Sequence, residues 1–143
     1  PRQAPKLVDD PPLPPKVADP RLQKAFEERA RPVEVLAVWK AGRARSPTPA
    51  ELLKPVVQAL LEVEPDTLPQ QVVEHVHAHH VHLANARTVV TTLDVVARAG
   101  SIRIMEELHE AFRRDLGIHP TLQTYEVLLG GYATAGDEKL VRL

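Results

Sequence analysis

The sequence predicts an all-α protein built from stacked helical hairpins. Of its 143 residues, 43% are hydrophobic but only 3% are aromatic, and this balance suits helices packed through Ala, Val and Leu better than an aromatic-rich β-sandwich. Apolar residues recur at helical spacing in successive segments that Pro or Gly separates. A set of residue types also recurs after 36 positions, which is typical of a repeat architecture.

Residues 1–20 are predicted to form an extended proline-rich arm. They hold seven of the fourteen prolines, and the pairs Pro11-Pro12 and Pro14-Pro15 prevent a helix and favour polyproline-like backbone. This segment has too few apolar side chains to form a core, so we expect it to be ordered by lying along a partner. The side chains expected to enter the groove of that partner are Leu7, Val8, Leu13 and Val17.

Residues 21–85 are predicted to form degenerate helical hairpins. Asp19 is a suitable N-cap with Pro20 in the first helical position, and two short helices should follow and end near Gly42. Thr48-Pro49-Ala50-Glu51 has the residues of a capping box with the Thr48 hydroxyl as cap. Pro55 is expected either to kink the following helix or to mark its true start. The apolar face of that helix holds Leu52, Leu53, Val56, Val57, Leu60 and Leu61, and another helix is expected over 69–83.

Residues 86–143 are predicted to contain one complete repeat, 86–121, and one partial repeat. A step back of 36 positions takes Thr124 to Thr88, Leu129 to Leu93 and Gly136 to Gly100. Each of these two glycines should end a first helix, since a left-handed backbone conformation after a helix favours Gly. Tyr125 and Tyr132 are expected to lie in the core between helices, rather than to stack on bases.

The stretch from Gly117 to Gly136 resembles the connector and first helix of a pentatricopeptide repeat. In that family a Gly-Ile-Lys-Pro-Asp-like connector leads into a Thr-Tyr-x-x-Leu-Ile helix that ends in Gly. The matching positions are Gly117, Ile118, Pro120, Thr124, Tyr125, Leu128, Leu129, Tyr132 and Gly136, whereas His119 and Thr121 depart from the pattern. The resemblance implies a right-handed superhelical α-solenoid like those of pentatricopeptide and tetratricopeptide proteins. It also implies an organellar location, with the mitochondrion expected and the plastid as the alternative.

The second predicted repeat is incomplete and would leave one apolar face uncovered. Such units bury their apolar faces only by stacking on neighbours. The chain is therefore expected either to be part of a longer protein or to be covered by a partner. Its first residue is Pro1, which fits a processed form that has lost a targeting peptide and fits a trimmed piece equally well.

The same resemblance implies how RNA is read. In the family, two side chains of each repeat recognise one base, and these positions map to Val90 and Thr121 in the complete unit and to Glu126 in the partial unit. Val90 cannot form a hydrogen bond and Glu126 is negative, so we expect the code to have decayed and contacts to the RNA backbone to remain.

Basic residues are concentrated in residues 21–45, which carry seven Lys or Arg and three acidic residues, although the net charge of the chain is −1. The turn over 40–45 is expected to be either a solvated loop or a phosphate clamp. The full set of RNA-binding candidates is Arg29, Arg31, Lys40, Arg43, Arg45, Arg87, Thr121 and Glu126.

Catalysis, cofactors and metals receive little support. The sequence has no glycine-rich phosphate loop, no nucleophile elbow and no Cys, so we expect a protein that is not an enzyme and needs no cofactor. His75, His79 and His82 have the i, i+4, i+7 spacing that can offer imidazoles to one metal ion. No Cys or carboxylate joins them, so a polar, pH-sensitive flank is expected rather than a metal site. No apolar run is long enough to span a bilayer.

We therefore expect a non-catalytic scaffold subunit or assembly factor of an organellar ribonucleoprotein, with the mitochondrial ribosome as the first candidate. It would contact RNA backbone and neighbouring proteins. One alternative is a transcript-specific factor for RNA processing or stability. The other is a purely protein-binding helical scaffold in a respiratory or photosynthetic complex.

Overall fold

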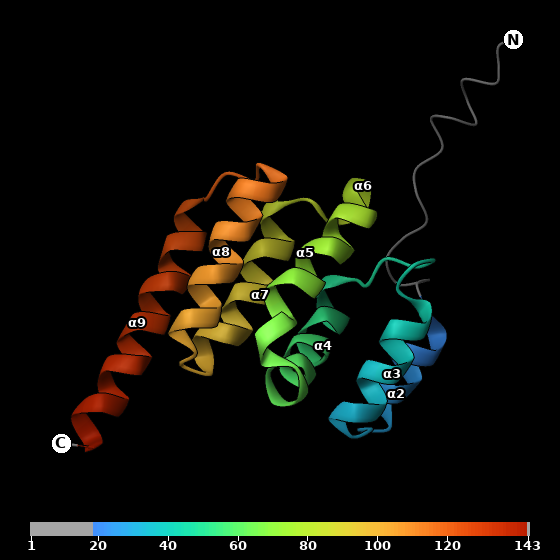
Figure 1. Cartoon of the computed structure of the whole chain (residues 1–143), viewed down its shortest axis with the longest axis horizontal. Coiled ribbons are helices and arrows are strands. Elements are labelled where there is room, and N and C mark those ends of the chain that lie inside the picture. The colour runs from blue at the N-terminus through green and yellow to red at the C-terminus, as the bar shows by residue number, and fades with distance from the viewer. Residues whose placement is uncertain (1–18, 143) are drawn as a thin grey trace, which may run out of the picture.

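The protein is all-α in the computed structural model, which describes residues 19–142, with side chains as far as residue 136 (Figure 1). These residues contain no strand. The predicted arm residues Leu7, Val8, Leu13 and Val17 lie outside the described residues. The helices are α2 (Pro20–Glu27), α3 (Pro32–Gly42), α4 (Ala50–Val63), the 3-10 turn η2 (Pro65–Thr67), α5 (Leu68–Ala78), α6 (His80–Leu83), α7 (Ala86–Arg98), α8 (Ile102–Leu116) and α9 (Leu122–Arg142).

Three helices begin at intervals of 36 residues. They are α4 at Ala50, α7 at Ala86 and α9 at Leu122, and α7 packs against α4 on one side and against α9 on the other. The helices that follow in the chain, α5 and α8, also pack on each other. The 36-residue register therefore extends back to the α4–α5 hairpin, where residue types alone do not reveal it.

The predicted apolar face of α4 is confirmed, and it forms part of one continuous core. Leu53, Val57 and Leu60 of α4 are fully buried, and the residues 36 positions later in α7 are buried as well. Those residues are Val89, Leu93 and Val96. Positions 36 residues apart in α4 and α7 are thus buried alike, although the residue types differ.

The N-terminal hairpin forms as predicted, but α4 starts differently from the prediction. The Asp19 side chain caps α2 by accepting from the backbone N–H of Arg21 at 2.9 Å. Pro49, not Thr48, occupies the cap position of α4, and no side chain there bonds to the helix. The Thr48 hydroxyl is instead buried and accepts from Trp39, so the expected capping box is wrong. Pro55 lies inside α4.

The helix expected over 69–83 is interrupted. His79 has φ −119° and ψ 46°, which ends α5 and separates it from the four-residue α6. The apolar residues of this segment nevertheless reach the core as predicted: Val72, Val73, Val76 and Leu83 are buried.

The two repeat glycines behave differently. Gly100 has φ 73°, so the left-handed turn expected after the first helix of the complete unit is present between α7 and α8. Gly136 lies inside α9, so the expectation that it ends a helix is wrong. After Gly100, the residues Ile102, Ile104 and Met105 pack in or against the core.

Gly131 allows α9 to approach its neighbours closely. A Cβ atom placed there would lie 2.5 Å from Met105 Sδ of α8 and 3.0 Å from Ala97 Cβ of α7. The adjacent Gly130 faces open space. The contact of α9 with both α7 and α8 therefore depends on the missing side chain at residue 131.

Candidate functional site

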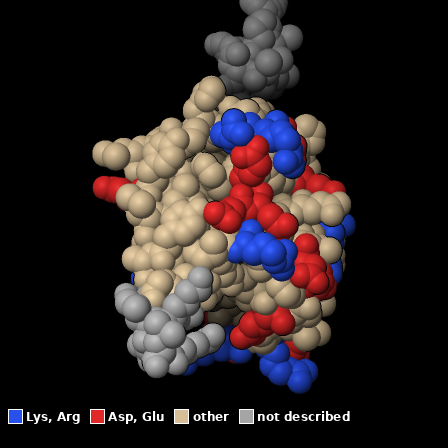
Figure 2. Space-filling view, turned by 60° about the vertical axis from the view of Figure 1, so that its left-hand side comes forward, with Lys and Arg blue, Asp and Glu red and all other residues tan. Residues whose placement is uncertain are grey.

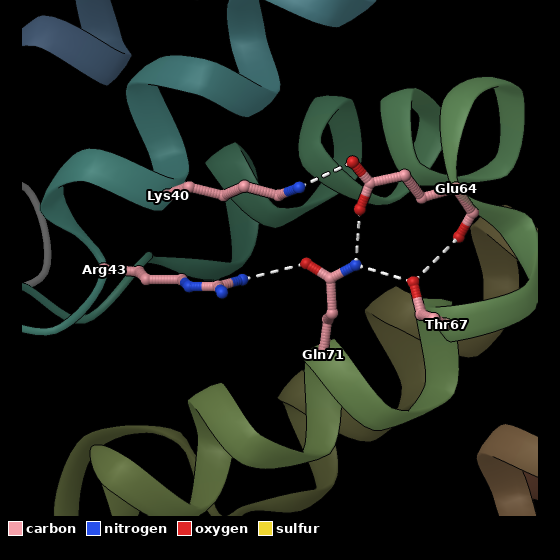
Figure 3. A network of polar contacts seen from close by, with 5 residues as sticks. All are labelled: Lys40, Arg43, Glu64, Thr67 and Gln71. Atoms are coloured by element: carbon pink, nitrogen blue, oxygen red, sulfur yellow. Dashed lines mark hydrogen bonds and ion pairs between the residues drawn. The ribbon is translucent and has the colours of Figure 1, made fainter.

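Two of the predicted RNA-binding cations are held by contacts within the protein (Figure 3). Lys40 Nζ donates to Glu64 Oε2 at 2.5 Å, and Arg43 Nη1 donates to Gln71 Oε1 at 2.9 Å. Gln71 Nε2 in turn donates to Glu64 Oε1 at 2.7 Å and to Thr67 Oγ1 at 2.8 Å. These bonds join α3 to the connection between α4 and α5.

The surroundings of this network explain its charge state. Hydrogen bonds from Lys40, and then from Gln71, lower the pKa of Glu64, so the carboxylate stays ionised at a more acidic pH than an ordinary glutamate does. The Arg43 guanidinium also lies 4.8 Å from the centre of the Trp39 ring. Lys40 and Arg43 thus stabilise the fold, and the turn over 40–45 retains only Arg45 as an exposed cation without such a contact.

Three predicted cations remain exposed around the α2–α3 hairpin: Arg29 and Arg31 in the turn between the two helices, and Arg45 beyond the opposite end of α3. Arg29 follows α2 with φ 54°, and Arg31 pairs with Glu34 at 3.3 Å. The backbone N–H of Arg31 also donates to Glu34 and is the main cause of the lowered pKa of that carboxyl. The cations available for phosphate contacts are therefore Arg29 and Arg31 at one end of α3 and Arg45 at the other.

The positions implied for base reading hold other side-chain contacts. Thr121 and Thr124 exchange hydrogen bonds, since the N–H of each donates to the hydroxyl of the other at 3.0 and 3.2 Å. Thr121 thus caps the start of α9. Glu126 is exposed beside a hollow of about 390 Å³ between α7 and α9, which Asp94 and Arg98 also line. Val90 is half-buried.

Arg87 of α7 links two successive units. Its Nη2 lies 3.3 Å from Glu51 Oε1 of α4, and both side chains are exposed. The two residues are 36 positions apart. The Arg87 charge is therefore partly matched within the stack, in a pair that is worth little to stability because water surrounds it.

An acidic groove, not foreseen from the sequence, runs between α5 and α8. Its volume is about 640 Å³, and Arg114 is the cation among its lining residues. The acidic residues that line it are Asp66, Glu74, Glu106, Glu107, Glu110 and Asp115. The closely spaced Glu106, Glu107 and Glu110 were a signal in the sequence, but the packing of α5 on α8 brings Asp66 and Glu74 to them. Arg103, Arg113 and Arg114 form ion pairs with four of these carboxylates. The charge of the groove stays negative, which disfavours contact with a nucleic-acid backbone.

The three histidines do not form a common flank. His75 is buried, and its Nε2 accepts from the backbone N–H of Thr48 at 3.1 Å, so Nδ1 carries the proton and has no hydrogen-bond partner. His79 Nε2 donates to the carbonyl oxygen of Arg43 at 2.7 Å. The break at His79 places His82 on the separate helix α6. Within the described residues, no three His, Cys, Asp or Glu side chains are placed to hold a metal ion.

A stripe of large apolar side chains lies exposed on α9. It consists of Leu122, Tyr125, Leu129 and Tyr132, and we call it the α9 stripe. The expectation that both tyrosines lie in the core is wrong, because among the described residues no further helix covers this side of α9. Figure 2, which views the molecule from this end, shows a broad surface without charged side chains beside a region where acidic and basic side chains are mixed.

The described part of the chain has no helix that meets the length and apolarity needed to cross a membrane. No known family, curated protein or solved structure matches the chain. Its function is therefore inferred from the repeat spacing, the exposed arginines, the acidic groove and the α9 stripe.

Proposed function

We propose that this chain is a non-catalytic scaffold of the pentatricopeptide-repeat kind that belongs to an organellar ribonucleoprotein. The observation that carries this proposal is the 36-residue interval between the starts of α4, α7 and α9. α7 packs against both α4 and α9, and positions 36 residues apart in α4 and α7 are buried alike. The proposed architecture is a right-handed superhelical stack of helical hairpins, in which each unit needs its neighbours for burial.

RNA contact in this proposal is limited to the phosphate backbone around the α2–α3 hairpin. Arg29, Arg31 and Arg45 are exposed there, whereas Lys40 and Arg43 are engaged within the protein. Val90 has no polar group, and Thr121 uses its hydroxyl to cap α9. These features favour contacts that position the protein over contacts that select a base.

The proposed setting is the mitochondrial ribosome, as a component or an assembly factor, with a plastid particle as the alternative. This rests on the resemblance of residues 117–136 to an organellar repeat family, together with the loss of base-reading side chains. The test is to follow the tagged protein in its source organism. Mitochondrial location and co-sedimentation with ribosomal particles are expected, and a soluble pool free of any particle would contradict the proposal.

A second experiment measures RNA contact directly. The full chain should bind short single-stranded RNAs weakly, with a strong dependence on salt and little on sequence. Replacing Arg29, Arg31 and Arg45 by Ala should weaken binding several-fold, while the control replacement of Arg98, Arg103 and Arg113 should have little effect. A strong preference for one RNA that survives moderate salt would instead indicate a transcript-specific factor.

The acidic groove favours a second candidate function, that of a purely protein-binding scaffold in a respiratory or photosynthetic complex. Six carboxylates line the surface between α5 and α8, and arginines pair with four of them. The negative charge that remains suits a basic protein segment better than RNA. This candidate predicts that the tagged protein sediments with a complex that ribonuclease leaves intact.

A further inference from the structure

The α9 stripe has the spacing of a helix contact. Leu122, Tyr125, Leu129 and Tyr132 follow each other at intervals of three, four and three residues, which places them along one side of the helix. They are 77%, 51%, 67% and 44% exposed, respectively. Four large apolar side chains in one continuous row differ from scattered exposed residues and mark an interaction surface.

The stripe is also the continuation of an interface that already exists in the protein. A step of 36 residues takes Tyr125 back to Val89 and Leu129 back to Leu93. Val89 and Leu93 are 4% and 0% exposed on α7, the helix that α9 covers. The same holds for Tyr132 and the fully buried Val96. Three of the four stripe residues on α9 thus correspond to buried positions of α7, whereas Leu122 corresponds to the exposed Ala86.

The neighbouring helix that covers α7 shows what kind of surface fits this row. From α9, the residues Thr124, Leu128 and Gly131 are buried and face the earlier helices. Small and leucine-type side chains at helical spacing therefore complement a row of larger apolar groups. An occupant of the α9 stripe needs a face of the same character.

Both edges of the stripe carry negative charge. Glu126 is exposed one helical step from Tyr125 on the side of α7. On the other side, the Tyr132 hydroxyl donates to Glu106 of α8 at 2.5 Å. Acidic side chains at both edges select an occupant whose own edges are basic, because like charges at the edge of an interface reduce affinity.

The acidic edges also argue against a second copy of this chain. In an antiparallel pair of α9 helices, matching Leu122 with Tyr132 and Tyr125 with Leu129 places the midpoint at Val127. The two Glu126 side chains would then lie next to each other across the two-fold axis. Two carboxylates at the centre of a small interface oppose self-association.

We propose that the α9 stripe is a docking site for an amphipathic helix of another protein, with an apolar contact face of small and leucine-type residues and with Lys or Arg along both edges. The apolar row supplies the anchors, as in other grooves that receive a helix. Glu126 and Glu106, at the two edges of the stripe, favour a partner with basic side chains at its own edges. The site lies on α9 and does not involve the arginines proposed for RNA contact. An experiment can therefore refute this proposal without affecting the proposed RNA binding.

The test uses two synthetic helical peptides with the same Ala- and Leu-containing face, one with Lys and one with Glu along the edges. Fluorescence anisotropy with the full chain measures their dissociation constants. The Lys-edged peptide is expected to bind about 10-fold or more tightly than the Glu-edged peptide at low salt. Leu129→Asp should abolish binding, whereas Val81→Asp, at an exposed site on α6, should leave it unchanged.

A charge exchange provides the decisive comparison. Glu126→Lys should weaken binding of the Lys-edged peptide and strengthen binding of the Glu-edged peptide, while the helical circular dichroism of the protein stays unchanged. Absence of binding by either peptide, equal binding of both, or insensitivity to Leu129→Asp would overturn the proposal. Dimerisation of the chain in sedimentation experiments that Leu129→Asp removes would also overturn it, because the stripe would then belong to a second copy.

Discussion

The indole Nε1 of Trp39 donates a 2.9 Å hydrogen bond to the hydroxyl oxygen of Thr48, and both residues are buried. The backbone N–H of Thr48 donates in turn to His75 Nε2 at 3.1 Å. The three residues come from α3, from the segment before α4 and from α5. This chain of bonds connects the N-terminal hairpin to the first unit of the 36-residue register.

Thr48→Val should destabilise the protein by about 1 to 3 kcal/mol, because it leaves the buried indole N–H of Trp39 without an acceptor. Chemical denaturation monitored by tryptophan fluorescence would measure this, since Trp39 is the one tryptophan in the sequence. Thr91→Val, at a half-buried helix position, is the control, since it also replaces a Thr hydroxyl by a methyl group. Equal stability of the two variants would show that the Trp39 bond contributes nothing.

The stability of the fold should fall as the pH drops below about 6.5. Burial, followed by the nearby charges of His79 and Arg43, lowers the pKa of His75 from 6.5 to about 3. A group with a lowered pKa binds a proton more readily in the unfolded chain, so its contribution is complete above pH 6.5 and is lost as the pH falls towards 3. The slope for this one group is about 1.4 kcal/mol per pH unit.

Measurements between pH 6.5 and 5 isolate the histidine from most carboxylates, which titrate at lower pH. His75→Gln should flatten the dependence of unfolding free energy on pH in this range. His80→Gln, at an exposed position, should leave the slope of the parent protein intact. A slope that persists in His75→Gln would assign the effect to another group.

Gly131→Ala and Gly130→Ala should change stability in opposite directions. The new Cβ at residue 131 meets Met105 and Ala97 at 3.0 Å or less, and such overpacking costs about 1 to 3 kcal/mol. At residue 130 the Cβ meets nothing, and replacing Gly by Ala within a helix stabilises it by up to about 1 kcal/mol. Thermal melting of the two variants is sufficient, and a shift of the same sign in both would contradict the close approach of α9.

Gly100→Val should be more damaging than Gly136→Val. A β-branched residue at the φ of 73° found at Gly100 costs on the order of 1 to 2 kcal/mol. Gly136 is helical with open space around it, and Gly and Val differ there by only a few tenths of a kcal/mol in helix propensity. Comparable losses of melting temperature in both variants would mean that Gly136 also ends a helix.

The sequence by itself determined the all-α class, the first hairpin and the apolar face of α4. Capping at Asp19, Pro20 at the helix start and the periodicity of residues 52–60 act over one or two turns, so local physics is sufficient for them. The turn at Gly100 was predictable for the same reason. The repeat interval was visible in residue types only where both units retained them.

Tertiary structure alone decided which side chains are available at the surface. The Thr48 hydroxyl accepts from Trp39 and does not cap its own helix, while Lys40 and Arg43 bond to Glu64 and Gln71. Each of these partners lies 9 to 28 residues away in the chain, so local sequence patterns do not reveal the contacts. The exposure of Tyr125 and Tyr132 depends on whether another helix covers α9, which no periodicity within α9 can reveal. Periodicity identifies the face of a helix, whereas burial of that face depends on its neighbours.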